Sequence, residues 1–274
     1  MKKFKISDLI AKIFILIMAL ITLFPFIYMI LSSLMTYQEA TSIPPTLIPS
    51  ALHFENYSQA MSKAPFSRYF INTIITALST TLATLLTSIF AAFALVKLEF
   101  KGKDILTMIM AALLMVPYEI TVFTNYQTIA KLGLLNTYSA LIIPHLASIF
   151  FIFYLRGYLT NIPISYYKAA KVDGCGDLEF IWRIMIPMAK PALFTMGILN
   201  FISGWNSFLW PILVTNSKNM RLISNGLSAF TSESGTAVHL QMAASTITIL
   251  PILILYLIFR KQIMKGVGSS GIKG

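Results

Sequence analysis

Six long apolar runs, separated by shorter polar segments, set the pattern of this chain. A helix rises about 1.5 Å per residue, so about 20 mostly apolar residues cross the roughly 30 Å hydrocarbon core of a membrane. The runs of about this length are Ile10–Leu31, Phe70–Val96, Ile105–Phe123, Leu141–Tyr158, Ala192–Val214 and Ala243–Phe259. The pattern predicts an all-α, polytopic membrane protein with six transmembrane helices that form one domain over residues 1–274.

Two of the runs are more polar than the others. The second is rich in Thr and Ser, and the fifth contains Gly and Asn. Small and hydroxylated residues are enriched where membrane helices pack against each other. These two runs are therefore predicted to contact other helices or to line a polar path.

The composition supports the membrane assignment. Hydrophobic residues make up 57% and charged residues 11% of the 274 residues, and the mean hydropathy is +0.76. A soluble domain carries about 25% charged residues. No polar segment is long enough for a separate folded domain, which excludes an enzyme with a catalytic domain outside the membrane.

The net charge of +11 is distributed unevenly between the polar segments. Sixteen of the 21 Lys and Arg residues lie before the first run, between the second and third, between the fourth and fifth, and after the sixth. Positive residues stay on the cytoplasmic side of multi-pass proteins. We therefore expect both termini and the segment after the fourth run to be cytoplasmic, in a cell membrane. The charge indicates orientation and contact with anionic lipid, and not a nucleic-acid partner.

The usual signatures of catalysis and metal binding are missing. His53, His145 and His239 are scattered, without an HExxH motif or a Cys/His metal spacing. We expect no cofactor, no metal site, no catalytic residue and no ATP hydrolysis by this chain. Energy for uphill transport would come from an ion gradient or another subunit. Glu119, close to Pro117, is the one carboxylate within a run, and it is either a rim residue facing water or part of a solute path.

A polar segment of residues 161–191 separates the fourth and fifth runs. Pro163 suits the first turn of a helix, Asp173-Gly174 would end that helix, and a second helix would begin near Asp177. Pro187 and Pro191 are predicted to close the second helix. The segment is either an ordinary interfacial loop or a helix–Gly–helix element that docks a partner.

This segment resembles the cytoplasmic coupling motif of ABC-transporter permeases. Lys168 stands where the family has Glu, and Cys175 where it has Ala. The segments Leu132–Pro144 and Gly204–Leu213 and the tail KGVGSSGIKG are similar to carbohydrate-uptake permeases of the maltose and glycerol-3-phosphate type. The positions that match the coupling motif are Ala169, Ala170, Asp173, Gly174, Phe180, Ile184 and Pro187.

The resemblance implies an importer built from two homologous permease chains, two cytoplasmic ATPase subunits and an extracytoplasmic solute-binding protein. This chain would be one permease, working by alternating access. Its coupling helix would dock in an ATPase through Ala169, Ala170, Asp173 and Gly174, followed by Pro187. The tail residues Gly271, Lys273 and Gly274 would also contact the ATPases, and the loop Thr215–Met242 would dock the binding protein. The residues expected on the substrate path are Glu119, Trp205 and Asn206.

Two other functions remain open at this point. One is a secondary transporter or channel that works alone, which the scarcity of charge within the runs disfavours. The other is a structural membrane subunit without a solute path. For an importer the solute would be a sugar, an oligosaccharide or a glycerol phosphate. The absence of Lys and Arg from the middle of the runs favours a neutral sugar.

Overall fold

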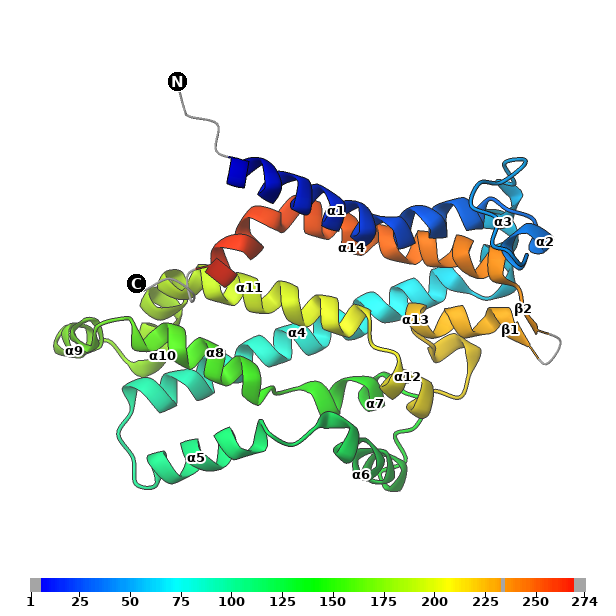
Figure 1. The fold of residues 1–274 in the computed structure, drawn as a ribbon. Coiled ribbons are helices and arrows are strands. Elements are labelled where there is room, and N and C mark those ends of the chain that lie inside the picture. Colours follow the sequence, from blue (N-terminus) through cyan, green and yellow to red (C-terminus); the bar gives the residue numbers. More distant parts are fainter. Residues whose placement is uncertain (1–5, 233–234, 269–274) are drawn as a thin grey trace. The chain divides into compact units, whose positions relative to one another are not determined.

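The computed structural model of the protein describes residues 6–232 and 235–268 (Figure 1). Internal contacts divide the chain into two compact units, one made of Met1–Phe66 and Gly226–Leu253, the other of Ser67–Asn225 and Ile254–Gly274. The fold is helical, as predicted. The one sheet in the described part of the chain is an antiparallel pair of two-residue strands.

The first unit contains a long apolar helix followed by short elements. Asn56 fastens two of them together, because its buried side-chain amide donates hydrogen bonds to the carbonyls of Ser33 (2.9 Å) and Met35 (2.8 Å). The elements are α1 (Ile6–Ser33), α2 (Tyr37–Ala40), α3 (Glu55–Lys63), η4 (Leu227–Phe230), β1 (Thr231–Ser232), β2 (Gly235–Thr236) and the first half of α14 (Val238–Gly268).

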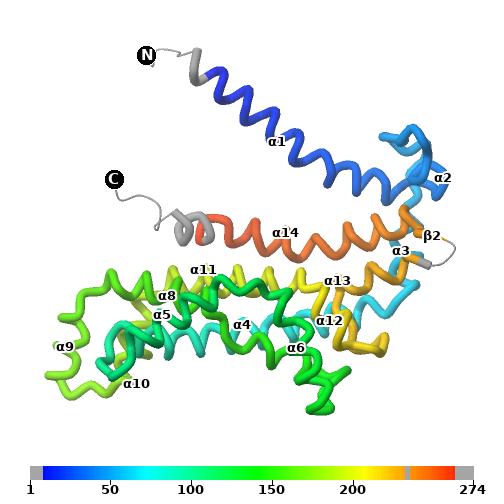
Figure 2. Tube along the Cα trace, turned by 60° about the horizontal axis from the view of Figure 1, so that its bottom comes forward, coloured from blue at the N-terminus to red at the C-terminus, as the bar shows by residue number. Residues whose placement is uncertain are grey.

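The second unit holds most of the remaining helices. Within it, α4, α8 and α11 lie side by side in both Figure 1 and Figure 2. Its elements are α4 (Phe66–Lys97), α5 (Lys103–Leu113), α6 (Tyr118–Lys131), α7 (Tyr138–Ile142), η1 (Ile143–His145), α8 (Ile149–Thr160), α9 (Ile164–Val172), α10 (Asp177–Phe180), η2 (Ile181–Met185), α11 (Ile186–Trp205), α12 (Leu209–Val214), η3 (Lys218–Met220) and α13 (Ile223–Gly226).

Four helices are long and apolar enough to span a membrane, and two bent pairs bring the number to as many as six. The long ones are Leu9–Ser33, Phe66–Lys97, Asp177–Trp205 and Val238–Gln262. The third and fourth runs are not single straight helices: α5 and α6 meet at 99°, and the α7–η1 segment meets α8 at 43°. Pro117, the N-cap of α6, accounts for the first break. A proline disfavours helical backbone at the residue before it, so a helix usually ends there.

The fifth span differs most from the prediction. It begins at Asp177 rather than Ala192 and ends at Trp205, with α12 as a separate helix. Pro187 and Pro191 do not close the preceding helix, since both lie inside α11. The wide π-type turn at Ile181–Met185 ends two residues before Pro187. A proline ring crowds the carbonyl four residues earlier, and a widened turn relieves that clash without ending the helix.

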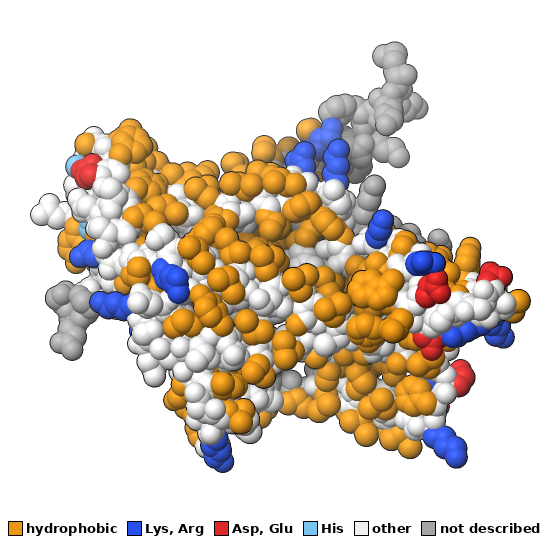
Figure 3. Space-filling model, turned by 180° about the vertical axis from the view of Figure 1, so that it is seen from behind, with side chains coloured by type: hydrophobic (Ala, Val, Ile, Leu, Met, Phe, Trp, Pro, Cys, Tyr) orange, Lys and Arg blue, Asp and Glu red, His pale blue; other side chains and the backbone are white. Residues whose placement is uncertain are grey.

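Hydrophobic side chains cover much of the face shown in Figure 3, with Lys, Arg, Asp and Glu in scattered groups. Much of this apolar surface is exposed in the isolated chain. On α5, for example, Ile105, Met108 and Ile109 are each more than half exposed. Such exposure would be costly in water and suits lipid or another membrane-embedded subunit.

Candidate functional site

The helix–Gly–helix element predicted from the sequence is present at Ile164–Phe180, and we call it the coupling element. Helix α9 ends at Val172, with Asp173 as its C-cap. Gly174 has a φ of +79°, and the amide of Cys175 donates to the carbonyl of Ala170 at 2.9 Å. Glycine adopts this left-handed conformation without steric cost. The chain therefore turns sharply between α9 and α10, as expected.

A polar clamp holds the two short helices in place. The Tyr167 hydroxyl donates to Oδ1 of Asp177 at 2.6 Å, and Lys171 Nζ lies 2.6 Å from the same oxygen. The ammonium of Lys171 also lies 5.4 Å from the centre of the Tyr167 ring. The hydrogen bond to Asp177 raises the pKa of Lys171 above its ordinary value. An exposed ion pair adds little stability, so the clamp mainly fixes geometry.

An aromatic cluster attaches the coupling element to α4. Phe93 of α4 lies 5.8 Å from the ring centre of Tyr167 and 6.2 Å from that of Phe180, and the latter two are 5.0 Å apart. Phe93 and Phe180 are almost fully buried, in the same core as Ala170. The two contacts of Tyr167 are edge-to-face and the Phe93–Phe180 pair is tilted, and such contacts between aromatic rings favour particular distances and orientations. The coupling element is therefore packed firmly against a membrane-spanning helix.

Lys97 adds a second attachment at the end of α4. Its Nζ donates to the carbonyl of Ile162 at 3.0 Å, and the residue is 6% exposed. Ile162 directly precedes Pro163, the N-cap of α9. A buried ammonium requires a partner, and here the partner is the backbone at the entrance to the coupling element.

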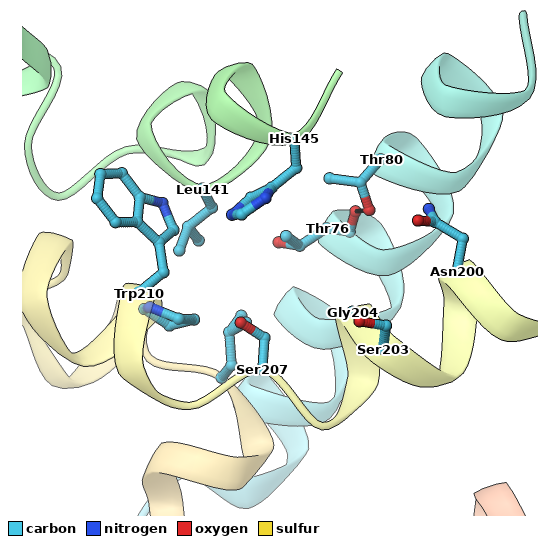
Figure 4. A pocket seen from close by; sticks show the side chains of 11 residues that line it. Thr76, Thr80, Leu141, His145, Asn200, Ser203, Gly204, Ser207 and Trp210 are labelled. Atoms are coloured by element: carbon cyan, nitrogen blue, oxygen red, sulfur yellow. Dashed lines mark hydrogen bonds between the residues drawn. The ribbon is translucent and has the colours of Figure 1, made fainter. Parts of the chain in front are cut away.

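A second feature of the same unit is a partly open cavity with a volume of about 90 Å³ (Figure 4). Within the described part of the chain, none of its lining residues is charged. The lining residues are Thr76, Thr80, Leu141, His145, Asn200, Ser203, Gly204, Ser207, Trp210, Pro211 and Leu222.

Breaks in two spans create this cavity. One lies between η1 and α8, the other between α11 and α12. Thr84 and Thr87 of α4 donate to the carbonyls of His145 (3.1 Å) and Leu146 (3.0 Å), which lie at the first break. Hydroxyl groups commonly satisfy the backbone groups that a broken membrane helix leaves free. The polar second run therefore packs against another span, as predicted.

Glycine lets α11 approach α4 closely beside the cavity. A Cβ atom on Gly204 would lie 3.3 Å from the Cα and Cβ of Ala77. Asn200, one turn earlier on α11, donates to the hydroxyl of Thr81 at 3.3 Å. The Gly and Asn of the fifth run thus also serve helix packing, which confirms the expectation for that run.

Two polar atoms of the cavity lining are buried without a hydrogen-bond partner among the described residues: His145 Nε2 and Thr76 Oγ1. Figure 4 shows both side chains extending toward the same space. Trp210 differs, because its indole N–H donates to the carbonyl of Ala140 at 2.9 Å. Thr80 also uses its hydroxyl hydrogen internally, toward the carbonyls of Thr76 and Ala77.

Comparison with known proteins assigns the chain to a family. Residues 84–268 match the family described as "Binding-protein-dependent transport system inner membrane component". The chain belongs to this family. It is therefore a multi-pass inner-membrane permease subunit of an ABC transporter. Such a subunit works with a binding protein and an ATPase, and it does not itself hydrolyse ATP.

Individual relatives cover nearly the whole permease. It is 30% identical to the arabinooligosaccharides transport system permease protein AraQ of Bacillus subtilis, over 99% of this chain and 98% of that protein. It is 29% identical to the sn-glycerol-3-phosphate transport system permease protein UgpE of Yersinia pestis, over 96% of each. A crystal structure of a bacterial ABC transporter involved in the import of the acidic polysaccharide alginate contains a similar chain, with a TM-score of 0.82 and 25% identity over 95% of this permease and 99% of that chain.

The predicted ATPase-contacting residues differ in their surroundings. Ala169, Asp173, Gly174 and Pro187 are exposed, whereas Ala170 is buried in the core beneath the coupling element. Lys168, which stands in place of the family Glu, is exposed and forms no ion pair with any described residue. The tail residues Gly271, Lys273 and Gly274 lie outside the described residues.

The predicted substrate-path residues do not line the cavity. Trp205 is 4% exposed and packs against Phe70 and Phe201. Asn206 is exposed at the C-cap of α11, and Glu119 is exposed in the first turn of α6. Their role in a solute path stays a prediction.

The cavity residues His145, Thr76 and Ser207 were not predicted from the sequence. The Thr-rich second run and the segment Gly204–Leu213 were recognised, but neither pattern shows which side chains face a common space. That depends on where the two spans break and how they pack.

Proposed function

We infer that this permease is one of two transmembrane subunits of an ATP-driven saccharide importer, and that it receives the ATP-driven motion through its coupling element. The names of its relatives support a carbohydrate or related solute, since they cover arabinooligosaccharides, sn-glycerol-3-phosphate and alginate. The loop Thr215–Met242 is proposed to dock the binding protein. The distribution of Lys and Arg supports cytoplasmic termini and a cytoplasmic coupling element.

The observation that carries the proposal is the two-sided character of the coupling element. Outside its packed core it exposes Ala169, Val172 and Leu178; Val172 is 86% and Leu178 63% exposed. Large apolar side chains left exposed on a polar loop are typical of a protein-binding surface. We propose that one ATPase subunit binds here and that a second one binds at the equivalent element of the partner permease.

On its other side the coupling element is continuous with the spans. The rings of Phe93, Tyr167 and Phe180 attach it to α4, and α10 continues through η2 into α11. A displacement of α9 by an ATPase would therefore move α4 and α11 together. This is the kind of rigid coupling that alternating access between inward-open and outward-open states requires.

Substitutions of Gly174 test this function. No atom lies within 4 Å of a Cβ added at Gly174, so its φ of +79° is the only obstacle to a side chain. We expect Gly174→Val to distort the turn and to abolish stimulation of the ATPase by the binding protein. Gly174→Asn should retain it, because Asn tolerates the left-handed conformation. The measurement is ATPase activity of the complete transporter in proteoliposomes, with co-purification of the ATPase as a second readout.

Gly102 provides a matched control. It has a φ of +83° and equally open surroundings, but it precedes α5 rather than lying in the coupling element. Gly102→Val should introduce similar strain and leave the stimulated ATPase activity largely intact. Equal loss of activity in both Val variants would show a general effect on stability and argue against the proposed role. Solute uptake by the purified chain alone, without ATP, would instead support a stand-alone transporter.

A further inference from the structure

Helix α4 crosses the second unit without a break. It is 32 residues long, and its sequence contains neither Pro nor Gly. Other spans of the unit are divided: α5 and α6 meet at 99°, the α7–η1 segment and α8 meet at 43°, and a π-type turn interrupts the span that contains α11. Kinks in helices arise mainly at prolines and at such wide turns. Helix α4 is therefore the stiffest connection between the two ends of the unit.

Two fully buried polar residues near the start of α4 bind the backbone around η3 and α13. The side-chain amide of Asn72 donates to the carbonyls of Asn219 (2.7 Å) and Arg221 (3.0 Å). The adjacent Thr73 accepts a hydrogen bond at Oγ1 from the amide of Ile223, at 2.9 Å. Three successive bonds therefore attach this stretch of the loop between the fifth and sixth runs to one turn of α4.

The side chains that make these bonds are themselves held in place. The Thr73 hydroxyl donates to the carbonyl of Tyr69 at 2.7 Å, and the hydroxyl of Tyr138, in α7, donates to Oδ1 of Asn72 at 2.6 Å. Leu222, between the bound loop residues, is fully buried in a core that includes Trp210. A buried polar group that loses its partner is costly. The loop and the start of α4 should therefore move as one body.

The other end of α4 carries the coupling element. Phe93 packs against its aromatic rings, and Lys97 binds the backbone that leads into it. Thr73 and Phe93 are twenty residues apart, which is about 30 Å along a helix and equals the thickness of the hydrocarbon core. Figures 1 and 2 show α13 and the coupling element near opposite ends of α4.

We propose that Asn72 and Thr73 are positioning residues that transmit docking of the binding protein to the coupling element through α4. The inference rests on the proposed function, because the bound backbone belongs to the loop Thr215–Met242, and it names the residues that connect the two proposed docking surfaces. Neither residue lines the cavity of Figure 4. Their effect on coupling is therefore separate from any contact with solute there.

A connection of this kind has a thermodynamic signature. If nucleotide on the ATPases changes the affinity for the binding protein, the binding protein changes the affinity for nucleotide by the same factor. A variant that loosens the loop from α4 lowers this factor, even where each partner still binds. A variant that only destabilises the permease lowers the amount of active complex and leaves the factor unchanged.

Asn56 is a matched control for a purely structural role. It is also a buried asparagine whose amide donates to two backbone carbonyls, those of Ser33 (2.9 Å) and Met35 (2.8 Å). These contacts lie in the first unit and do not include α4. Asn56→Leu and Asn72→Leu should therefore lower the unfolding temperature to a similar extent, since each leaves two carbonyls without their donor.

The experiment measures the Kd between the complete transporter in lipid nanodiscs and its fluorescently labelled binding protein. Each variant is measured without nucleotide and with a non-hydrolysable ATP analogue. We expect the two Kd values of the wild type to differ by about 5-fold or more, as is usual for coupled sites. Thr73→Val and Asn72→Leu should remove most of this difference and most of the stimulation of the ATPase by the binding protein.

The conservative variant Thr73→Ser keeps the hydroxyl and should keep the difference in Kd. Thr73→Val leaves one amide without its acceptor, whereas Asn72→Leu removes two donors. Thr73→Val therefore decides the question if Asn72→Leu does not assemble.

The wild type separates the possible failures. If it shows neither stimulation by the binding protein nor a nucleotide-dependent Kd, the proposed function is wrong and the inference falls with it. If the wild type is coupled and Thr73→Val keeps the full difference in Kd, the inference is overturned and the proposed function stands. An equal loss in Asn56→Leu would also overturn it, as a general effect of destabilisation. Loss in Thr73→Val, with the difference retained in Thr73→Ser and Asn56→Leu, would establish it.

Discussion

Single residues connect the coupling element to the spans, and Lys97 is the clearest case. Its position at the end of the second run would suggest an ordinary cytoplasmic flanking charge, as the positive-inside rule expects. In the structure it is buried and donates to the carbonyl of Ile162. Lys97 therefore has two roles. Its charge favours the cytoplasmic side of the membrane, and its hydrogen bond fixes the backbone that leads into α9.

Replacement of Lys97 tests this contact. Lys97→Met should keep most of the packing but leave the carbonyl of Ile162 without its donor, at a cost of about 1–3 kcal/mol in stability. Lys97→Arg should retain much of the stability that Lys97→Met loses. We expect the Met variant to unfold at lower temperature and to hydrolyse ATP with less solute moved per ATP. An unchanged transport-to-hydrolysis ratio in Lys97→Met would show that the contact has no part in coupling.

At the scale of elements, the packing of α11 against α4 determines where the cavity forms. The sequence predicted that both runs contact other helices or line a polar path, but not that Gly204 faces Ala77. A Cβ on Gly197, in contrast, would meet Leu85 at an ordinary 3.6 Å. The two glycines of one helix are therefore not equivalent.

This difference leads to a prediction for α11. Gly204→Val should destabilise the permease by about 1–3 kcal/mol, because its methyl groups extend from a Cβ already 3.3 Å from backbone. Gly197→Ala should be neutral or slightly stabilising, since Ala is the better helix former. Thermal unfolding in detergent checks both. Equal unfolding temperatures for the two variants would contradict the close approach of α11 and α4.

At the scale of the whole molecule, the single cysteine reports orientation. Cys175 is half-buried in the coupling element, and burial is the main cause that raises the pKa of its thiol. The thiolate is the reactive form, so labelling should accelerate as the pH rises from 7 toward 9. We expect a membrane-impermeant maleimide to label Cys175 in inverted vesicles and not in intact spheroplasts. Labelling from the outside would contradict the cytoplasmic placement of the coupling element.

The labelling rate of the Cys175 thiol also reports whether ATPase subunits are bound to the permease. Bound ATPase subunits should slow its labelling in inverted vesicles, because they would cover the face next to Cys175. Chelation of Mg²⁺ or removal of the nucleotide provides conditions without ATP turnover, and the purified permease alone gives the unprotected rate. Identical rates with and without the ATPase would place its binding site elsewhere.

The sequence by itself determined the class of molecule, because the length and apolarity of a span are local properties that hydrocarbon thickness imposes on every membrane helix. It also determined the turn at Gly174, where the backbone conformation depends on one residue type. The break near Pro117 and the widened turn before Pro187 follow in part from the local geometry of proline, whereas the angles of 99° and 43° and the cavity around His145 were decided by the tertiary structure. The angles and the cavity depend on which distant helix supplies the hydroxyl group, the space or the close contact that compensates a broken span.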